Sequence, residues 1–229
     1  MNRNPSKFVL GFVKLTGLPG GLLLLRPKVY LMNKSTCKRK LPKGCILMSN
    51  HTSLMDFVLY LFVFFERNLR FLMAEVLFRK GKLFSWFLYK IGGIFVNRNT
   101  YDFSFVGESV AALEKGESIG IFPEARLPVN GKSHSFKPSV AMIALQSGAP
   151  IIPVYTNGCY FKLSRARVMI GEPIYVKDLV AENETVGEDG LPSRDELLRL
   201  AAVLEGKIYE LKDELERRVE EENGNKKSK

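Results

Sequence analysis

Short apolar runs alternate along the chain with longer segments in which apolar residues recur every three or four positions. The short runs predict buried strands at 44–49, 69–74, 94–97, 118–122 and 151–155. The longer segments predict helices at 56–66, 75–90, 102–115 and 138–146. Strands that alternate with helices are typical of βαβ units. We therefore expect an α/β fold with a central, mostly parallel sheet flanked by helices.

The two ends of the chain differ from this alternation. Asn4 and Pro5 predict the start of a helix that ends near residue 16. The pattern does not match a signal peptide, and the 11 uncharged residues from 15 to 25 are fewer than the about 20 that span a membrane. Apolar periodicity over 195–222 predicts a long C-terminal helix, and a hairpin is expected around 160–175. We expect a helical N-terminal segment (1–35), an α/β domain (36–181) and an acidic C-terminal helix and tail (182–229).

The composition is that of a folded chain with excess positive charge. Hydrophobic residues make up 46% and charged residues 25%, which excludes a disordered chain. The net charge of +10 and the pI of about 9.5 favour nucleic acid, a membrane surface or a phosphorylated substrate as partner. Ten basic residues and no acidic residue precede Asp56, whereas 14 acidic and six basic residues lie within 182–222.

Few residues are available for disulfide or metal chemistry. The three cysteines, at positions 37, 45 and 159, form no close pair, and there are two histidines. This excludes a disulfide framework and a cysteine-based zinc site, and it fits a reduced compartment.

The predicted N-terminal helix is basic and largely apolar. Lys7, Gly11 and Lys14 share one stripe, and apolar side chains cover the remainder. Such a helix suits the interface of a membrane that contains anionic lipid. The alternative is a helix packed on its own domain with a solvated lysine stripe.

His51 and Asp56 lie between a predicted strand and the next helix, where reactive groups of α/β folds gather. Five residues span about 140° of a helix, so the two side chains meet only if His51 precedes the helix and Asp56 lies in its first turn. The carboxylate would then orient the imidazole for removal of a proton from a hydroxyl. Alternatively, Ser53 and Asp56 form a capping box that only stabilises the start of the helix.

Further charged residues follow later strands. Arg98 comes directly after one apolar strand, and Glu124 and Arg126 follow another. Arginine presents a planar fork that suits phosphate or carboxylate. Lys137 adds a charge that a phosphate would attract. For Arg98, Arg126 and Lys137 the alternative is a solvated surface residue, and for Glu124 it is a structural partner of an arginine.

Four segments of the chain resemble known sequence blocks in the same order. They are 50–56 (NHTSLMD), 93–98 (GIFVNR), 122–126 (FPEAR) and 149–154 (APIIPV). The first is similar to the histidine–four residues–aspartate signature of the glycerolipid acyltransferases, in the 1-acyl-sn-glycerol-3-phosphate acyltransferase branch. The first and third blocks together are specific, and the resemblance covers roughly residues 45–157.

The resemblance implies roles for the candidate residues. His51 would be the general base on the free hydroxyl of a lysophospholipid, and Asp56 would orient it. The hydroxyl would attack the thioester of acyl-CoA or acyl-carrier protein directly, without a metal or a tightly bound cofactor. The residues implied to bind the acceptor are Arg98, Glu124, Arg126 and Lys137.

The third block departs from the family at Ala125, where glycine is usual.

The activity that the resemblance implies is acylation of 1-acyl-sn-glycerol-3-phosphate to phosphatidic acid in phospholipid biosynthesis, at the cytoplasmic face of an anionic membrane. Two alternatives remain: the same chemistry on another lysophospholipid or an aminolipid, and a non-catalytic basic protein bound to membrane. Nucleic-acid binding rests on net charge alone and is not expected.

Overall fold

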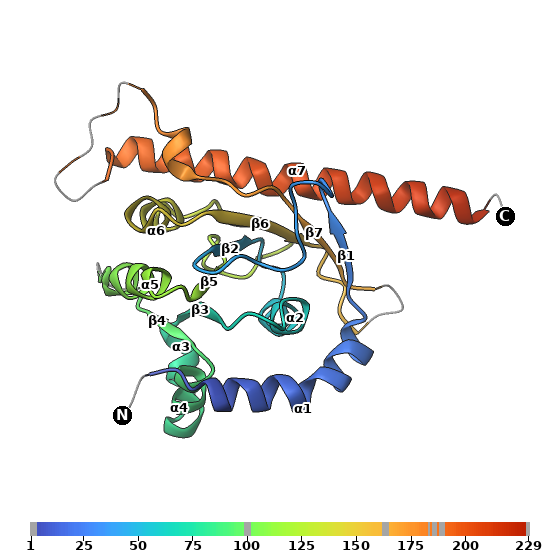
Figure 1. Ribbon diagram of the computed structural model, residues 1–229, viewed down its shortest axis with the longest axis horizontal. Coiled ribbons are helices and arrows are strands. Elements are labelled where there is room, and N and C mark those ends of the chain that lie inside the picture. Colours follow the sequence, from blue (N-terminus) through green and yellow to red (C-terminus); the bar gives the residue numbers. More distant parts are fainter. Residues whose placement is uncertain are drawn as a thin grey trace.

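The computed structural model describes residues 4–98, 102–161, 165–182, 184, 187 and 191–227. Within them, seven strands form one sheet in the order β1-β7-β6-β2-β5-β3-β4 (Figure 1). All neighbouring strands are parallel except β6 and β7. The predicted α/β fold with a mostly parallel sheet is confirmed. The strands are β1 (Lys28–Leu31), β2 (Ile46–Ser49), β3 (Leu69–Ala74), β4 (Ile94–Val96), β5 (Ser118–Ile121), β6 (Ile151–Thr156) and β7 (Arg167–Ile170).

Helices cover both faces of the sheet. Side chains of α5, α6 and α7 pack on one face, and those of α1, α2 and α4 pack on the other. Figure 1 shows α7 along one side of the sheet and α1 on the opposite side. Along β2, Ile46 and Met48 face the first layer and Leu47 faces the second, as strand geometry requires. The helices are α1 (Lys7–Leu25), α2 (Met55–Val63), α3 (Glu75–Phe78), α4 (Lys82–Lys90), α5 (Ser104–Glu114), α6 (Ser139–Ser147) and α7 (Arg194–Lys227), with a short 3-10 helix at Val176–Leu179.

Helix α1 is longer than the sequence predicts. It continues to Leu25 with Pro19 inside it, although a proline normally interrupts a helix. Gly17 and Gly21 lie against the Phe62 ring of α2, where an added Cβ would come within 3.0 and 2.3 Å of ring atoms. Only glycine permits this close approach, and the contact with α2 offsets the hydrogen bond that the proline removes.

Two other helix boundaries differ from the prediction. The carbonyl of Ser6 accepts the N–H of Leu10 at 3.0 Å, so the N-cap of α1 is Ser6 and not Asn4. The segment 75–90 forms two helices, α3 and α4, because Gly81 between them adopts φ +132°. A backbone conformation of this kind cannot continue a right-handed helix.

The differences in the sheet concern its β1 edge. Strand β1 was not predicted, because its four residues begin with a lysine and show no long apolar run. It pairs with β7, so the N-terminal segment 1–35 contributes an edge strand to the sheet. The hairpin expected around 160–175 is wrong in position: the antiparallel pair is β6 with β7, so one of its strands ends before residue 160. Residues 162–164 lie outside the described part of the chain.

Lys14 points toward the protein and not toward solvent. It is 3% exposed, and its ammonium group donates to the carbonyls of Phe65, at 2.9 Å, and Arg67. Burial lowers the pKa of Lys14 to about 8. The alternative of a solvated lysine stripe is therefore wrong for Lys14, because its amine donates to two carbonyls after α2.

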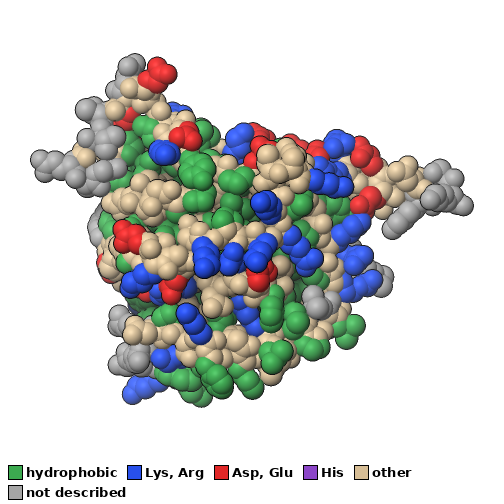
Figure 2. Space-filling view, in the orientation of Figure 1, with side chains coloured by type: hydrophobic (Ala, Val, Ile, Leu, Met, Phe, Trp, Pro, Cys, Tyr) green, Lys and Arg blue, Asp and Glu red, His purple; other side chains and the backbone are tan. Residues whose placement is uncertain are grey.

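The outer face of α1 is apolar instead. The exposed side chains include Phe8 (81%), Leu15 (68%) and Leu23 (75%). Figure 2 shows hydrophobic side chains along the edge of the molecule where α1 lies, and a band of basic side chains across the middle of the same view. Among the described helices, none is long and apolar enough to cross a membrane.

Asn50 joins the loops that follow β2 and β6. Its side-chain amide donates to the carbonyl of Thr156 at 2.9 Å and accepts the N–H of Thr156 at 2.9 Å. Both residues are buried, so no water is available to bond the N–H and carbonyl of Thr156 in place of the Asn50 amide. The loop after β2 is thus fixed to the neighbouring strand.

We predict that Asn50→Ala lowers the free energy of unfolding by about 2–6 kcal/mol, because two buried backbone groups lose their partners at about 1–3 kcal/mol each. Asn33→Ala is the matched control, since Asn33 makes its side-chain bonds on the exposed surface. It is expected to lose about 0.5 kcal/mol. Urea titration of both variants checks the difference, and equal losses would contradict the role of Asn50.

Candidate active site

The loop after β2 and the first turn of α2 bring His51 and Asp56 together. His51 Nδ1 lies 2.9 Å from Asp56 Oδ2. His51 belongs to the loop and Asp56 is the second residue of α2, so the angular separation of a regular helix does not apply. When Nδ1–H donates to the carboxylate, Nε2 is left as a proton acceptor. The structure contains the contact that the spacing predicts.

The Asp56 carboxylate is fully buried and accepts five hydrogen bonds. Besides His51, Oδ2 accepts the backbone N–H groups of Thr52 (2.6 Å) and Ser53 (2.9 Å). Oδ1 accepts the Thr52 hydroxyl at 2.8 Å and the hydroxyl of Tyr160. Together these donors replace the water that burial removes. The reciprocal bond of a capping box is not formed, because the Ser53 hydroxyl accepts the N–H of Met55 and the Asp56 N–H donates to the Ser53 carbonyl.

The residues after β5 hold the imidazole from its other side. The His51 ring stacks on Phe122, with centroids 4.3 Å apart and planes inclined by 15°. The backbone N–H of His51 donates to Glu124 Oε1 at 3.0 Å. Burial raises the pKa of Glu124, which is 3% exposed. Glu124 therefore contacts the backbone of the histidine and not an arginine.

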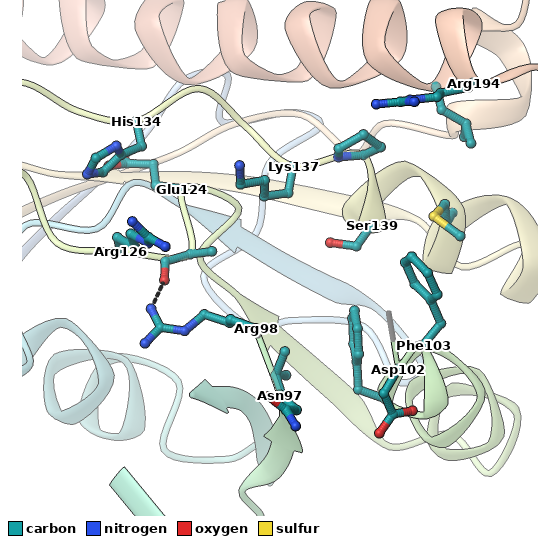
Figure 3. Close-up of a pocket in the computed structure, with 16 residues that line it drawn as sticks. Asn97, Arg98, Asp102, Phe103, Glu124, Arg126, His134, Lys137, Ser139 and Arg194 are labelled. Carbon is teal, nitrogen blue, oxygen red and sulfur yellow. Dashed lines mark hydrogen bonds between the residues drawn. The ribbon is translucent and has the colours of Figure 1, made fainter. Parts of the chain in front are cut away.

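Arg98 is fixed in place at the end of β4. Its backbone N–H and Nε point to Glu75 Oε2, at 3.3 and 3.5 Å, and its Nη1 donates to the carbonyl of Ala125 at 2.7 Å (Figure 3). Hydrogen bonds and the positive charge of Arg98 hold the pKa of Glu75 below its usual value, against the opposing effect of desolvation. The guanidinium is thus oriented before any ligand binds.

Ala125 adopts a conformation that normally selects glycine. Its φ is +58°, in the left-handed region. Ala125 therefore adopts a conformation that favours glycine, at the position where glycine is usual in the family that the third block resembles. This costs about 1–2 kcal/mol, and the turn directs the Ala125 carbonyl toward Arg98.

Arg126 and Lys137 are exposed side chains of one cavity. They line a space of about 730 Å³ together with Arg98, Glu124 and Arg194 from the first turn of α7. We call this space the polar cavity. Figure 3 shows Arg98, Arg126 and Lys137 converging on it from three segments of the chain. Several cations around one cavity are suited to an anion such as phosphate.

A second space of about 470 Å³ has an apolar wall. We call it the apolar cavity. Its polar lining residues are His51, Arg98 and Arg126, and the rest of its wall is aliphatic and aromatic. Arg98, Ala125 and Arg126 line both cavities, so the two spaces meet at the Arg98–Ala125 hydrogen bond. A ligand with a charged head and a hydrocarbon tail fits this pair of cavities, with its middle near the imidazole.

Some residues of the site were not predicted. Glu75, the partner of Arg98, directly follows β3, and its place after an apolar strand is a signal that the sequence does offer. Tyr160 carries no such signal, because it lies in the loop after β6, beyond the matched blocks. Across the described residues, no three His, Cys, Asp or Glu side chains are placed to bind one metal ion.

Comparison with known proteins shows which family the chain matches. The model of the family described as "Acyltransferase" matches residues 32–157. Over 134 residues the chain is 29% identical to a 1-acyl-sn-glycerol-3-phosphate acyltransferase of Borreliella burgdorferi, covering 56% of this chain and 53% of the relative. Over 159 residues it is 26% identical to 1-acyl-sn-glycerol-3-phosphate acyltransferase beta of Homo sapiens, covering 67% and 54%. The chain spans about half the length of these curated relatives.

One solved structure is similar over most of the chain. It is the crystal structure of PlsC, the 1-acyl-sn-glycerophosphate (LPA) acyltransferase of Thermotoga maritima, with a TM-score of 0.59 and 26% identity. The match covers 90% of this chain and 80% of that one. The similarity extends beyond the family-model region and so includes parts of the terminal segments.

Proposed function

The chain belongs to the acyltransferase family, and from this premise we propose that it transfers a fatty acyl group from a thioester donor to the free hydroxyl of 1-acyl-sn-glycerol-3-phosphate. The product is phosphatidic acid. The observation that carries the proposal is the His51–Asp56 pair: His51 lines the apolar cavity, which adjoins the cavity lined by Arg98, Arg126 and Lys137. The names of the similar proteins support the same substrate.

The proposed reaction uses His51 as the general base. Nε2 removes the proton of the acceptor hydroxyl as its oxygen attacks the thioester carbonyl. Asp56, bonded to Nδ1, holds the tautomer and stabilises the imidazolium that forms. When the tetrahedral intermediate collapses, the C–S bond breaks and the thiolate takes the proton from Nε2. The ester product and the free thiol balance the reaction, and no acyl-enzyme forms.

The acceptor is proposed to lie across the two cavities. Arg98, Arg126 and Lys137 would bind its phosphate in the polar cavity, where Arg98 is already oriented by Glu75. Its hydrocarbon chain would occupy the apolar cavity. This places the free hydroxyl of the glycerol between them, close to His51.

We propose that the protein binds the surface of an anionic membrane by its α1 side. The exposed apolar residues of α1 are joined by Leu83 (78%) and Phe84 (41%) of α4, a helix that contacts α1. Phe84 also lines the apolar cavity, as do the exposed Leu54 and Val76. The cavity mouth is therefore apolar, which suits entry of a lipid from the membrane. A thioester donor, acyl-CoA or acyl-carrier protein, would approach from the cytoplasm.

Two alternatives are separated by the acceptor that reacts. The same dyad would acylate another lysophospholipid or an aminolipid if the polar cavity accepts a larger head group. A non-catalytic membrane-binding protein would acylate nothing. The oriented Arg98 and the buried Asp56 favour an enzyme, because a protein that only binds membrane needs neither.

We predict that His51→Ala lowers kcat by at least about 100-fold, because general-base catalysis contributes about 10²–10⁴ in rate. Asp56→Asn is expected to lower kcat by a similar factor, since the amide cannot stabilise the imidazolium as the carboxylate does. The assay uses purified protein in detergent or liposomes, with radiolabelled acyl-CoA and acyl-carrier protein as donors and lysophospholipids, a monoacylglycerol and a lipid amine as acceptors.

Circular dichroism controls for loss of fold in both variants. Activity of His51→Ala equal to that of the unaltered protein would contradict the mechanism. If the unaltered protein acylates no acceptor in the panel, the non-catalytic alternative is favoured instead.

We predict that Arg126→Ala raises KM for 1-acyl-sn-glycerol-3-phosphate about tenfold or more, because a hydrogen bond to a charged group is worth about 1.5–3 kcal/mol. KM for a monoacylglycerol, which has no phosphate, is expected to stay the same. Arg79→Ala is the matched control, since Arg79 is exposed at the end of α3 and lines neither cavity. Equal changes for both acceptors would remove Arg126 from the phosphate site.

We predict that replacing Phe8, Phe12 and Leu15 together by serine lowers binding to phosphatidylglycerol vesicles by at least about tenfold. Full burial of each such side chain in an apolar phase is worth about 1.5–3 kcal/mol. The triple serine variant of Tyr175, Leu198 and Tyr209, exposed apolar residues away from α1, is the control in co-sedimentation. Equal binding by both triple variants would contradict the proposed orientation.

A further inference from the structure

Tyr160 contacts the proposed catalytic pair from outside the family-model region. It follows β6 and lies three residues beyond the matched segment 32–157. Its side chain is 7% exposed, and its hydroxyl donates to Asp56 Oδ1 in the interior. A phenol buried against a buried carboxylate is a specific contact, because neither group has water as a substitute partner.

The turn that carries Tyr160 is packed tightly on the loop of His51. Gly158 adopts φ +64°, and a Cβ on it would lie 2.6 Å from the Thr52 hydroxyl oxygen. Two residues further on, the chain places Tyr160 against the same carboxylate that the Thr52 hydroxyl contacts. The Asn157 side chain closes the turn by accepting the N–H of Arg167, the first residue of β7, at 2.9 Å. The position of the phenol is therefore set by the β6–β7 connection.

The donors divide between the two carboxylate oxygens. Oδ2 takes the imidazole and two backbone N–H groups, while Oδ1 takes the hydroxyls of Thr52 and Tyr160. The bonds to Oδ1 fix rotation about the carboxylate axis, and that rotation decides whether Oδ2 points at His51 Nδ1. We propose that Tyr160 is a positioning residue for the acyl transfer, acting through Asp56 on His51. The kinetic consequences of this inference rest on the proposed function.

The phenol donates over the whole working range of pH. Burial, followed by the nearby Asp56 carboxylate, raises the pKa of Tyr160 well above its usual value. The hydroxyl therefore stays protonated, and it withdraws part of the negative charge of the carboxylate. The other ionisable groups that face the pair are Tyr60 of α2, whose pKa burial also raises, and Glu124.

Loss of the Tyr160 hydroxyl is expected to shift the pH dependence of the reaction in one direction. With one donor fewer, the Asp56 carboxylate carries more unshared charge and holds the imidazole proton more tightly. The base is then neutral only at higher pH. The acid limb of the pH–rate profile therefore moves upward in Tyr160→Phe, whereas a purely structural role would lower activity without moving it.

The test compares Tyr160→Phe with Tyr155→Phe in the purified, full chain. Tyr155 lies on β6 among the residues packed with the α7 layer, so the control removes a phenol hydroxyl on the other side of the sheet. We expect Tyr160→Phe to lower kcat about tenfold, with KM for donor and acceptor within about twofold and the acid limb raised by about half a pH unit. The control is expected to keep all three quantities.

Two further measurements keep the test decisive. Thr52→Val removes the other hydroxyl from Oδ1 and is expected to move the acid limb in the same direction, so it replaces Tyr160→Phe if that variant does not fold. The second is an NMR titration of the His51 ring in a His134→Gln background, which leaves one histidine signal and needs no turnover.

Upward movement of the His51 titration midpoint in Tyr160→Phe supports the inference even if the unaltered protein acylates none of the acceptors. In that case the proposed function fails and the positioning contact stands. An unmoved midpoint, together with unchanged kcat in a folded variant, overturns the inference.

Discussion

The burial of one charge, the Asp56 carboxylate, is the constraint on which the site depends. A carboxylate without solvent requires hydrogen bonds from the protein. Here the carboxylate lies in the first turn of α2, and its donors come from two other segments, the loop after β2 and the turn after β6. These segments must therefore converge for the protein to fold stably. The same convergence orients His51, so the hydrogen bonds that stabilise the buried carboxylate also arrange the groups of the proposed chemistry.

The parallel sheet makes this convergence possible. Strand β2 lies in the middle with β5 and β6 as its neighbours, and all three end at the same edge. His51 follows β2, Glu124 follows β5 and Tyr160 follows β6, so residues far apart in sequence meet over one strand end. Arg98 follows β4, two strands beyond β5, and the left-handed turn at Ala125 spans this gap by presenting its carbonyl to the guanidinium.

The alternation of apolar runs and helical segments was sufficient to predict the central strands. The contact of His51 with Asp56 was allowed by their spacing and implied by the family resemblance of the first block. The alternation failed where a partner distant in sequence decides the outcome. Helix α1 packs on Phe62 through two glycines on either side of its proline, and Lys14 turns inward to donate to two carbonyls after α2. Neither partner is visible in the local pattern. Tyr160 is a further example, since its contact with Asp56, 104 residues away in the sequence, gives no local signal.

The orientation of Lys14 also changes how the basic N-terminal region is understood. A solvated lysine stripe would have placed the apolar side of α1 on the protein, with charge outward. Instead the amine is 3% exposed and the aromatic side chains of Phe8 and Phe12 face outward. Since α1 contacts α4, and Phe84 of α4 lines the apolar cavity, the outward apolar surface is continuous with residues at the cavity wall. A lipid acceptor could then move its tail from bilayer to cavity without crossing water, while its phosphate reaches the cations beyond Arg98. The proposed membrane contact would rest on apolar area near the cavity, and the positive charge of the other N-terminal residues would add long-range attraction.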